Sequence, residues 1–556
     1  MEQKYQIFNL WCEKATFDKD LITELNNMKH ATEKIEDAFF RELEFGTGGL
    51  RGKTGAGTNR INVYTVARAT AGLANYLSKE FQGKISVAIG YDTRIKSKLF
   101  AETAANVLAA KGISVNLISR PLPTPFLSYV VRKLCCQAGI MITASHNPAI
   151  YNGYKVYGQD GCQITTEAAD NIYSEISKLD YFTSLPDMEA SPPVTNVSEK
   201  IYRSFITDVF SLSLTDEIDK NLSIVYTPLN GTGLEPVIDI LKKKDFQNIT
   251  VVKEQASPDG TFPTCPFPNP ELPGAMELGL DYARKSGADI LLATDPDCDR
   301  VGVAVKDGKN YRLLTGNEVG ILLLDYICKQ KQEKNAMPEN PVCVKTIVTT
   351  DLAEKIAANY GVKTINVLTG FKFIGEKIGM LESNGKKSRY LLGFEESCGY
   401  LSGTHARDKD GVNAALLICE MCANYKKHGI SLSDRLKGLY DKYGYSLSDL
   451  LSYTFEGETG MKKMQMFMQT LREEKLSFGD FSVLETVDFL AGIDDLPKSD
   501  VLKFTLSENA SLIVRPSGTE PKLKFYLSAV AEDENNASEI IQKLRFCTNT
   551  FVNNYS

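Results

Sequence analysis

Short apolar segments alternate with segments of helical period along most of the chain, and polar residues follow directly after each apolar segment. Apolar runs bounded by turn residues predict buried strands, whereas apolar residues three or four positions apart predict helices. Strands are predicted at 85–90, 114–119, 138–143, 222–227, 249–254, 288–294, 342–350, 363–370 and 388–393. The intervening segments, such as 98–112, predict helices. This alternation predicts βαβ units and therefore α/β domains built on parallel sheets.

The same order of strand, polar loop and helix occurs three times, and the last part of the chain differs from it. Residues 1–44 predict amphipathic helices, and a polar stretch at 181–200 indicates a boundary. The last part combines strands predicted at 500–506, 510–514 and 522–530 with a helix at 537–552, which is typical of an α+β unit. We predict four domains, at 1–206, 207–315, 316–445 and 446–556.

The composition is that of an ordinary folded protein, with 43% apolar and 24% charged residues among 556. The net charge of −7 argues against a nucleic-acid-binding protein, which needs a basic surface. It also means that an anionic substrate needs locally clustered Arg and Lys. No apolar run is long enough for a transmembrane helix, and the first residues lack the apolar stretch of a signal peptide. Twelve scattered cysteines fit reduced thiols, so we expect a cytoplasmic protein without a membrane partner.

The loop at 143–148, TASHNP, follows an apolar strand and carries a hydroxyl beside a histidine. Serine is a weak nucleophile unless it is activated or charged with a group to transfer. The residues of this loop also favour a simple turn, because Pro148 restricts Asn147 to extended backbone. Taken alone, this motif leaves both interpretations of Ser145 open. Lys155 brings a cation close to the same loop.

The loop at 295–300, DPDCDR, places three carboxylates at alternate positions after a strand. Such groups repel one another strongly at a few ångströms, and a hard divalent cation with oxygen ligands removes the repulsion. The spacing therefore favours a Mg²⁺ site over a solvated loop. A phosphatase-type nucleophilic aspartate is a competing use, but it usually has a hydroxyl residue where Asp299 stands. Arg300 is suited to a phosphate.

The loop that starts at Arg515 combines a guanidinium with neutral donors, Ser517, Thr519 and the amides around Gly518. This combination suits a phosphate dianion, and a simple hairpin turn is the alternative.

Two further loops offer polar groups, and a surface loop is the alternative for both. Glu395 and Ser397 follow the strand at 388–393 and could bond sugar hydroxyls, and Lys372 adds a cation. Arg51 lies in a glycine-rich loop at 45–60 that lacks the spacing of a P-loop or of a dinucleotide fingerprint.

Together these motifs resemble the α-D-phosphohexomutase superfamily, whose members carry a phosphoserine loop, a metal loop, a sugar loop and a phosphate loop in this order. The extended N-terminal helix and the phrases FGTGGLRG, GFKFIG and ARDKDG resemble the longer branch that includes bacterial α-phosphoglucomutases and the phosphopentomutase-like enzymes. Pro296 stands where many members have Gly, which should not remove a ligand. Gly399 stands where some members have a His, which weakens the expectation of a dual mannose and glucose enzyme.

The resemblance implies an α/β fold, with three similar α/β domains with mixed sheets plus a C-terminal α+β (TATA-binding-protein-like) domain around a central cleft. It implies reversible conversion of a hexose 1-phosphate to its 6-phosphate, with glucose preferred, through phosphorylated Ser145 and a glucose 1,6-bisphosphate intermediate. The expected catalytic residues are Arg51, Ser145, His146 and Lys155. The expected ligands of one Mg²⁺ are Ser145, Asp295, Asp297 and Asp299. The expected substrate-binding residues are Arg300, Lys372, Glu395, Ser397, Arg515, Ser517, Gly518 and Thr519.

Several alternatives stay open at this point. Mannose and pentose phosphates are alternative substrates, and a phosphatase would use the same serine and metal with water as the acceptor. A non-catalytic sugar-phosphate-binding protein is a more remote alternative, because it would be expected to lack the serine or an aspartate. A phosphosugar is the expected partner in each case, and the sequence does not indicate an oligomeric state.

Overall fold

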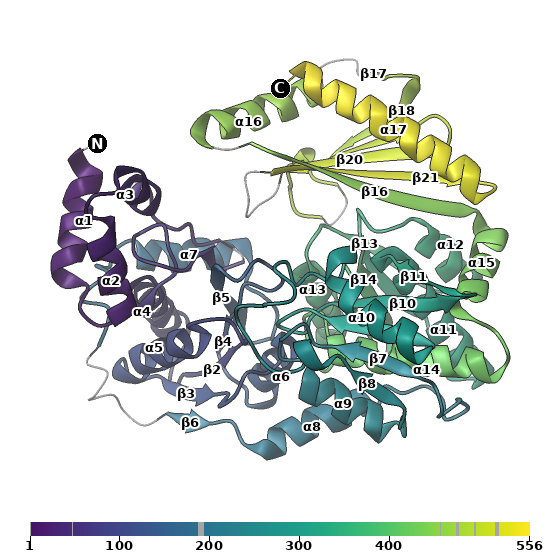
Figure 1. Cartoon of the computed structure of the whole chain (residues 1–556), viewed down its shortest axis with the longest axis horizontal. Coiled ribbons are helices and arrows are strands. Elements are labelled where there is room, and N and C mark those ends of the chain that lie inside the picture. The colour runs from purple at the N-terminus through teal and green to yellow at the C-terminus, as the bar shows by residue number, and fades with distance from the viewer. Residues whose placement is uncertain are drawn as a thin grey trace.

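The computed structural model describes residues 2–46, 48–186, 194–455, 457–473, 477–493, 496–516 and 522–555. Four sheets follow one another along the chain. Figure 1 shows the first sheet beneath the N-terminal helices at one end, the second and third sheets beside it, and the fourth sheet above the third. The predicted arrangement of three α/β units and one α+β unit is confirmed.

The first sheet has the strand order β1-β5-β4-β2-β3-β6. Its strands are β1 (Leu50–Lys53), β2 (Ser86–Tyr91), β3 (Ser114–Leu117), β4 (Ala138–Ile142), β5 (Tyr151–Gly158) and β6 (Thr195–Asn196). Three helices precede it, α1 (Glu2–Lys14), α2 (Lys19–Met28) and α3 (Thr32–Phe39). The helices that connect or flank its strands are α4 (Val63–Glu80), α5 (Ser97–Ala110), α6 (Thr124–Lys133) and α7 (Thr166–Ile176).

The second and third sheets have the orders β11-β10-β9-β7-β8 and β13-β12-β14-β15. The second unit contains α8 (Glu199–Phe210), β7 (Ile224–Thr227), α9 (Leu234–Lys243), β8 (Ile249–Val251), α10 (Pro273–Ser286), β9 (Ile290–Thr294), β10 (Val301–Asp307) and β11 (Asn310–Leu314). The third contains α11 (Gly316–Glu333), β12 (Val342–Thr346), α12 (Leu352–Asn359), β13 (Lys363–Val367), α13 (Phe371–Ser383), β14 (Tyr390–Glu395), β15 (Gly399–Leu401), α14 (Gly411–Lys427) and α15 (Leu432–Tyr443).

The fourth sheet, β16-β21-β20-β19-β18-β17, is antiparallel throughout its described pairings. Its elements are β16 (Tyr445–Thr454), α16 (Gly457–Glu473), β17 (Ser477–Phe478), β18 (Phe481–Asp488), β19 (Leu502–Leu506), β20 (Ala510–Pro516), β21 (Lys522–Ala531) and α17 (Glu534–Tyr555). The helices α16 and α17 lie on the face that points away from the third sheet (Figure 1). The predicted domain limits stay a prediction, and each sheet lies within one of the predicted ranges, except that β16 begins at Tyr445.

Antiparallel return strands are the feature that the alternation of strands and helices does not reveal. In the first three sheets a parallel core pairs with a strand that runs back beside it, β5 against β4, β10 against β9 and β15 against β14. The parallel core that the alternation predicts is present in each of these sheets, and so are the mixed sheets implied by the family resemblance. A tight polar loop, with no helix, joins each return strand to its neighbour, so the alternation does not reveal it.

The fourth domain contacts the third through polar and apolar groups. The hydroxyls of Thr350 and Ser446 lie 3.1 Å apart, and Lys503 Nζ lies 3.3 Å from Asp351 Oδ2. Buried apolar residues from both domains, including Val348 and Ile513, form one cluster beside these contacts. A cavity of about 330 Å³ opens between the two domains. Among the described helices, none is long and apolar enough to cross a bilayer.

The N-terminal helices are fixed to the first domain by Trp11, which is 1% exposed. Its ring meets Phe39, Tyr64 and Phe182 edge-on at centroid distances of 5.8, 5.6 and 5.5 Å. Such pairs add to the large apolar area that an indole buries.

Replacing this indole should loosen the N-terminal helices. We expect Trp11→Ala to lower the free energy of unfolding by about 3–5 kcal/mol, because it leaves a large cavity. Phe40→Ala is the control, since Phe40 is 48% exposed, and it should change stability by less than about 0.5 kcal/mol. Urea unfolding followed by circular dichroism measures both, because Trp11 is the only tryptophan. Equal unfolding midpoints for the two variants would contradict the packing role.

Candidate active site

The polar loops singled out in the sequence occupy the same topological position in successive sheets. We name them the serine loop (143–150, between β4 and β5), the metal loop (295–300, between β9 and β10), the sugar loop (396–398, between β14 and β15) and the phosphate loop (517–521, between β20 and β21). Each connects two neighbouring antiparallel strands. Each of the first three contains one non-glycine residue with left-handed φ: Ser145 at 53°, Cys298 at 52° and Cys398 at 60°. Strained backbone of this kind clusters at functional sites.

Ser145 of the first domain meets the metal loop of the second. Its Oγ lies 2.9 Å from Asp295 Oδ2 and 3.2 Å from His146 Nδ1, and the residue is 3% exposed. The sharp turn is stabilised from within, because the Ser145 amide donates to Thr143 Oγ1 at 2.8 Å. A hydroxyl and a carboxylate, both buried, therefore lie beside a half-buried imidazole.

The conformation of the serine loop is stabilised by a buried arginine on the preceding strand-to-helix connection. The Arg94 guanidinium donates to the backbone carbonyls of Ser145, Asn147, Pro148 and Tyr151. Its positive charge is balanced by Asp92, 3.3 Å from Nε, and its remaining N–H groups serve backbone oxygens that would otherwise be poorly solvated.

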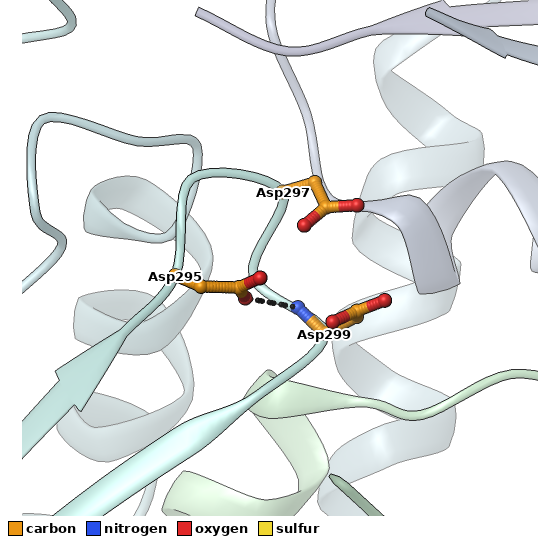
Figure 2. A group of neighbouring side chains, drawn as sticks. All are labelled: Asp295, Asp297 and Asp299. Atoms are coloured by element: carbon orange, nitrogen blue, oxygen red, sulfur yellow. Dashed lines mark hydrogen bonds between the residues drawn. The ribbon is translucent and has the colours of Figure 1, made fainter. Parts of the chain in front are cut away.

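Asp295, Asp297 and Asp299 converge, with ligand oxygens within 4.8 Å of one another and all three side chains buried. Figure 2 shows them around the metal loop, where Asp295 Oδ1 accepts from the Asp299 amide at 3.0 Å. Asp297 Oδ2 accepts from Lys155 Nζ at 3.0 Å and from Thr124 Oγ1 at 2.9 Å.

Two oxygens of the cluster are left for a ligand. Asp297 Oδ1 and Asp299 Oδ1 are buried and have no hydrogen-bond partner among the described residues. Buried polar atoms are rarely left unpaired, so each such atom calls for an explanation. Oxygen donors of this kind are what Mg²⁺ prefers, and the residues present fit that ion.

The pKa shifts within the cluster show how strongly the buried carboxylates depend on nearby positive charge. Burial raises the pKa of Asp295 well above its usual range, and repulsion by Asp297 and Asp299 adds to the rise. Burial alone would also raise the pKa of Asp297, but Lys155 holds it below its usual value.

His146 is poised as a neutral imidazole. Burial lowers its pKa well below the usual value, and the nearby charges of Arg300 and Arg51 lower it further. A neutral ring can accept a proton, which a protonated one cannot.

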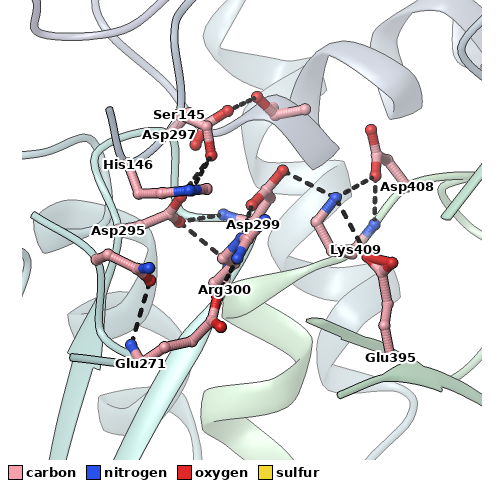
Figure 3. A network of polar contacts seen from close by, with 12 residues as sticks. Ser145, His146, Glu271, Asp295, Asp297, Asp299, Arg300, Glu395, Asp408 and Lys409 are labelled. Atoms are coloured by element: carbon pink, nitrogen blue, oxygen red, sulfur yellow. Dashed lines mark hydrogen bonds and ion pairs between the residues drawn. The ribbon is translucent and has the colours of Figure 1, made fainter. Parts of the chain in front are cut away.

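Two charged residues that sequence analysis did not assign to the site lie inside it. Lys409 Nζ lies 3.1 Å from Asp299 Oδ2 and 3.8 Å from Glu395 Oε1, and thus joins the metal loop to the strand that precedes the sugar loop (Figure 3). Burial alone would lower the pKa of Lys409, but the surrounding carboxylates raise it above its ordinary value. Glu271 pairs with Arg300. In the sequence, Lys409 was marked only by the phrase ARDKDG (406–411), and Glu271 only by the prolines that precede it at 258–270.

The other predicted residues occupy the surrounding elements. Arg51 lies on β1 opposite Gly153 of β5, close enough to affect His146. Lys372 lies in the first turn of α13, where burial lowers its pKa. Burial raises the pKa of Glu395 to about 7. Arg515 lies near the end of β20, with Nη2 3.5 Å from the Tyr526 hydroxyl. Burial raises the pKa of Glu396, and the charge of Arg515 opposes the rise.

One connected group therefore contains Ser145, His146, Lys155, Arg300, Glu395 and the three aspartates. Arg51 and Arg515 border it, and Ser397 lies on the sugar loop itself. Ser517, Gly518 and Thr519, the predicted phosphate-binding residues, lie outside the described residues.

Comparisons with known proteins agree along the whole chain. Residues 42–182, 200–308 and 315–443 match the alpha/beta/alpha domains I, II and III of phosphoglucomutase/phosphomannomutase, and residues 481–540 match its C-terminal domain. A phosphoglucomutase of Staphylococcus saprophyticus is 36% identical over 541 residues, which cover 94% of this chain and 96% of the relative. A phosphoglucomutase of Staphylococcus aureus is 34% identical, with coverages of 96% and 99%.

Solved structures share the fold. A putative phosphomannomutase from Thermus thermophilus superposes with a TM-score of 0.70 at 21% identity, covering 92% of this chain and 99% of that one. The open form of parafusin, a phosphoglucomutase from Paramecium, gives 0.69 at 19% identity, with coverages of 92% and 96%. The four matched domains and the identity to relatives of the same length lead to one conclusion: this chain belongs to the phosphoglucomutase/phosphomannomutase family.

Proposed function

We propose that this protein is a phosphoglucomutase that interconverts α-D-glucose 1-phosphate and glucose 6-phosphate. The observation that carries the proposal is the 2.9 Å contact between Ser145 Oγ and Asp295 Oδ2, which joins two loops 150 residues apart in the chain. A hydroxyl held against a buried carboxylate cluster suits reversible storage of a phosphoryl group. The phosphoglucomutases among the relatives support glucose as the sugar.

Asp295, Asp297 and Asp299 would hold one Mg²⁺ together with a phosphoserine oxygen. When bound, that ion neutralises charge on the phosphoryl group. The two unpaired oxygens of Asp297 and Asp299 support this assignment.

In the proposed reaction, phosphorylated Ser145 gives its phosphoryl group to a hydroxyl of the bound sugar phosphate. The bond between Oγ and phosphorus breaks, and a bond between the sugar oxygen and phosphorus forms, which yields glucose 1,6-bisphosphate. His146 accepts the proton of the attacking hydroxyl and passes it to Ser145 Oγ, which lies 3.2 Å from its Nδ1. Rephosphorylation of Ser145 from the other end of the bisphosphate runs the same steps in reverse.

Other residues of the site would bind the two ends of the sugar phosphate. Glu395 and Ser397 would accept from and donate to sugar hydroxyls, with Lys372 nearby. Arg515 and the phosphate loop with Ser517, Gly518 and Thr519 would bind the phosphate that does not react. Lys155, Arg51 and Arg300 would face the transferring group, whose negative charge they stabilise.

The free cysteines bear on the cellular compartment in which the enzyme works. Twelve free cysteines, nine of them buried, support the proposal that the enzyme works in a reducing cytoplasm. Turnover on glucose, mannose and ribose 1-phosphates distinguishes the proposed substrate from the mannose and pentose alternatives.

Removing the hydroxyl of Ser145 should abolish mutase turnover. We expect Ser145→Ala to lower kcat by about 10³-fold or more while the circular dichroism spectrum stays unchanged, because the phosphoryl carrier is lost. Ser177→Ala, at an exposed position of the same domain, should retain activity. With labelled glucose 1,6-bisphosphate, the unmodified chain should acquire label on Ser145 and release no free phosphate. Label on a different residue, or steady phosphate release, would contradict the proposal.

The raised pKa of Glu395 predicts a pH-dependent stability. Because the folded-state pKa is about 7 and the ordinary value is 4.5, the folded state binds more protons between these values. The stability of the unmodified enzyme should therefore fall as pH rises from about 4.5 to about 7, relative to Glu395→Gln, which cannot titrate. Thermal unfolding midpoints in the presence of a chelator measure this difference, which should level off above about pH 7. If the difference in unfolding midpoint between the two proteins stayed constant with pH, the raised pKa of Glu395 would be contradicted.

A further inference from the structure

The proline-rich stretch at 120–125, RPLPTP, contacts the metal loop of the neighbouring domain. It leads into α6, whose first residue is Thr124. The Thr124 amide donates to the backbone oxygen of Asp297 at 2.9 Å, and its Oγ1 donates to Asp297 Oδ2 at 2.9 Å. Thr124 is completely buried. The start of one helix in the first domain therefore binds both the backbone and the carboxylate of an aspartate in the second.

These contacts divide the two oxygens of the Asp297 carboxylate between different uses. Oδ2 accepts from Thr124 Oγ1 and from Lys155 Nζ, while Oδ1 is buried and has no partner among the described residues. The two oxygens are chemically equivalent, so what a donor on a fixed backbone sets is the direction of the carboxylate, with one oxygen bonded to donors and the other left open.

Thr124 is better suited than Lys155 to fix this orientation. Its hydroxyl is one bond from a β-branched carbon with few rotamers, and Pro123 and Pro125 restrict the backbone on both sides. Lys155 carries its ammonium on a flexible chain and also lies 3.9 Å from Asp299 Oδ2. Lys155 therefore supplies positive charge, whereas Thr124 fixes the orientation of the Asp297 carboxylate.

We propose that Thr124 is a positioning residue for the metal site: its hydroxyl fixes the Asp297 carboxylate so that Oδ1 faces the ion. The proposal rests on the Mg²⁺ site of the proposed function. It gives the proline-rich stretch a role, because this stretch then couples the domain that carries the serine to the domain that carries the metal ligands. Partners that orient a metal ligand typically change metal affinity by about 10–100-fold when they are removed.

The test is direct titration of the full-length protein with Mn²⁺, followed by electron paramagnetic resonance, which needs no turnover. Thr124→Val keeps the shape and removes the hydroxyl, so its Mn²⁺ dissociation constant should rise by about 10-fold or more. Thr124→Ser keeps the hydroxyl and should bind within about twofold of the unmodified protein. Intact mass confirms that all preparations carry the same phosphorylation.

A matched control is Thr103→Val on α5 of the same domain. Thr103 is also completely buried, and its Oγ1 donates to the Leu99 carbonyl at 2.8 Å. This variant loses a buried hydroxyl of similar setting and should keep the Mn²⁺ affinity. In steady-state assays, Thr124→Val should need more Mg²⁺ for half-maximal rate and should recover most of kcat at high Mg²⁺, which a general loss of stability would not produce.

The outcomes separate this proposal from the proposed function. If the unmodified protein does not bind Mn²⁺, the metal site itself is refuted. If it binds and Thr124→Val binds equally well with the melting midpoint of Thr103→Val, only the role of Thr124 is overturned. Should Thr124→Val not fold, Thr124→Ala and Thr124→Ser provide the same comparison, and equal affinities for these two would also overturn it.

Discussion

Three buried carboxylates within 4.8 Å of one another are the constraint on which the centre of this molecule depends. Removing one partner of a buried ion pair typically costs about 3–5 kcal/mol. The cations that compensate the cluster come from other domains, Lys155 from the first and Lys409 from the third. The charge that a metal site requires thus also binds three domains together, and the catalytic centre cannot form in any one of them alone.

The fold assembles this centre from loops that occupy equivalent positions, each between two adjacent strands of its sheet. Each functional loop joins two adjacent antiparallel strands, so strand pairing fixes both of its ends. In the first three loops, one residue with left-handed backbone, Ser145, Cys298 or Cys398, makes the turn between the two strands sharp.

Much of this arrangement is readable from the sequence, because strands and helices alternate clearly and polar motifs stand at strand ends. The convergence of the three aspartates was predictable from their spacing alone. The return strands were not, since 301–307 follows its loop too closely to show a separate period. Thr124 and Lys409 were not predicted for another reason. Each acts across a domain boundary, and no local pattern reports a contact between residues more than a hundred positions apart, as with Thr124 and Asp297. Glu271 pairs with Arg300 of the same domain, 29 residues away, and no motif marked it.

The charge balance also bears on how the proposed substrate, an anionic sugar phosphate, would enter a protein of net charge −7. Three cations of the centre pair with carboxylates, Arg300 with Glu271, Lys155 with Asp297 and Lys409 with Asp299. A phosphate approaching this centre therefore meets carboxylates as well as cations. These three cations become available to a phosphate when their carboxylates have another positive partner. Metal and phosphosugar should then favour each other's binding through the same lysines, and by linkage the coupling must be equal in both directions.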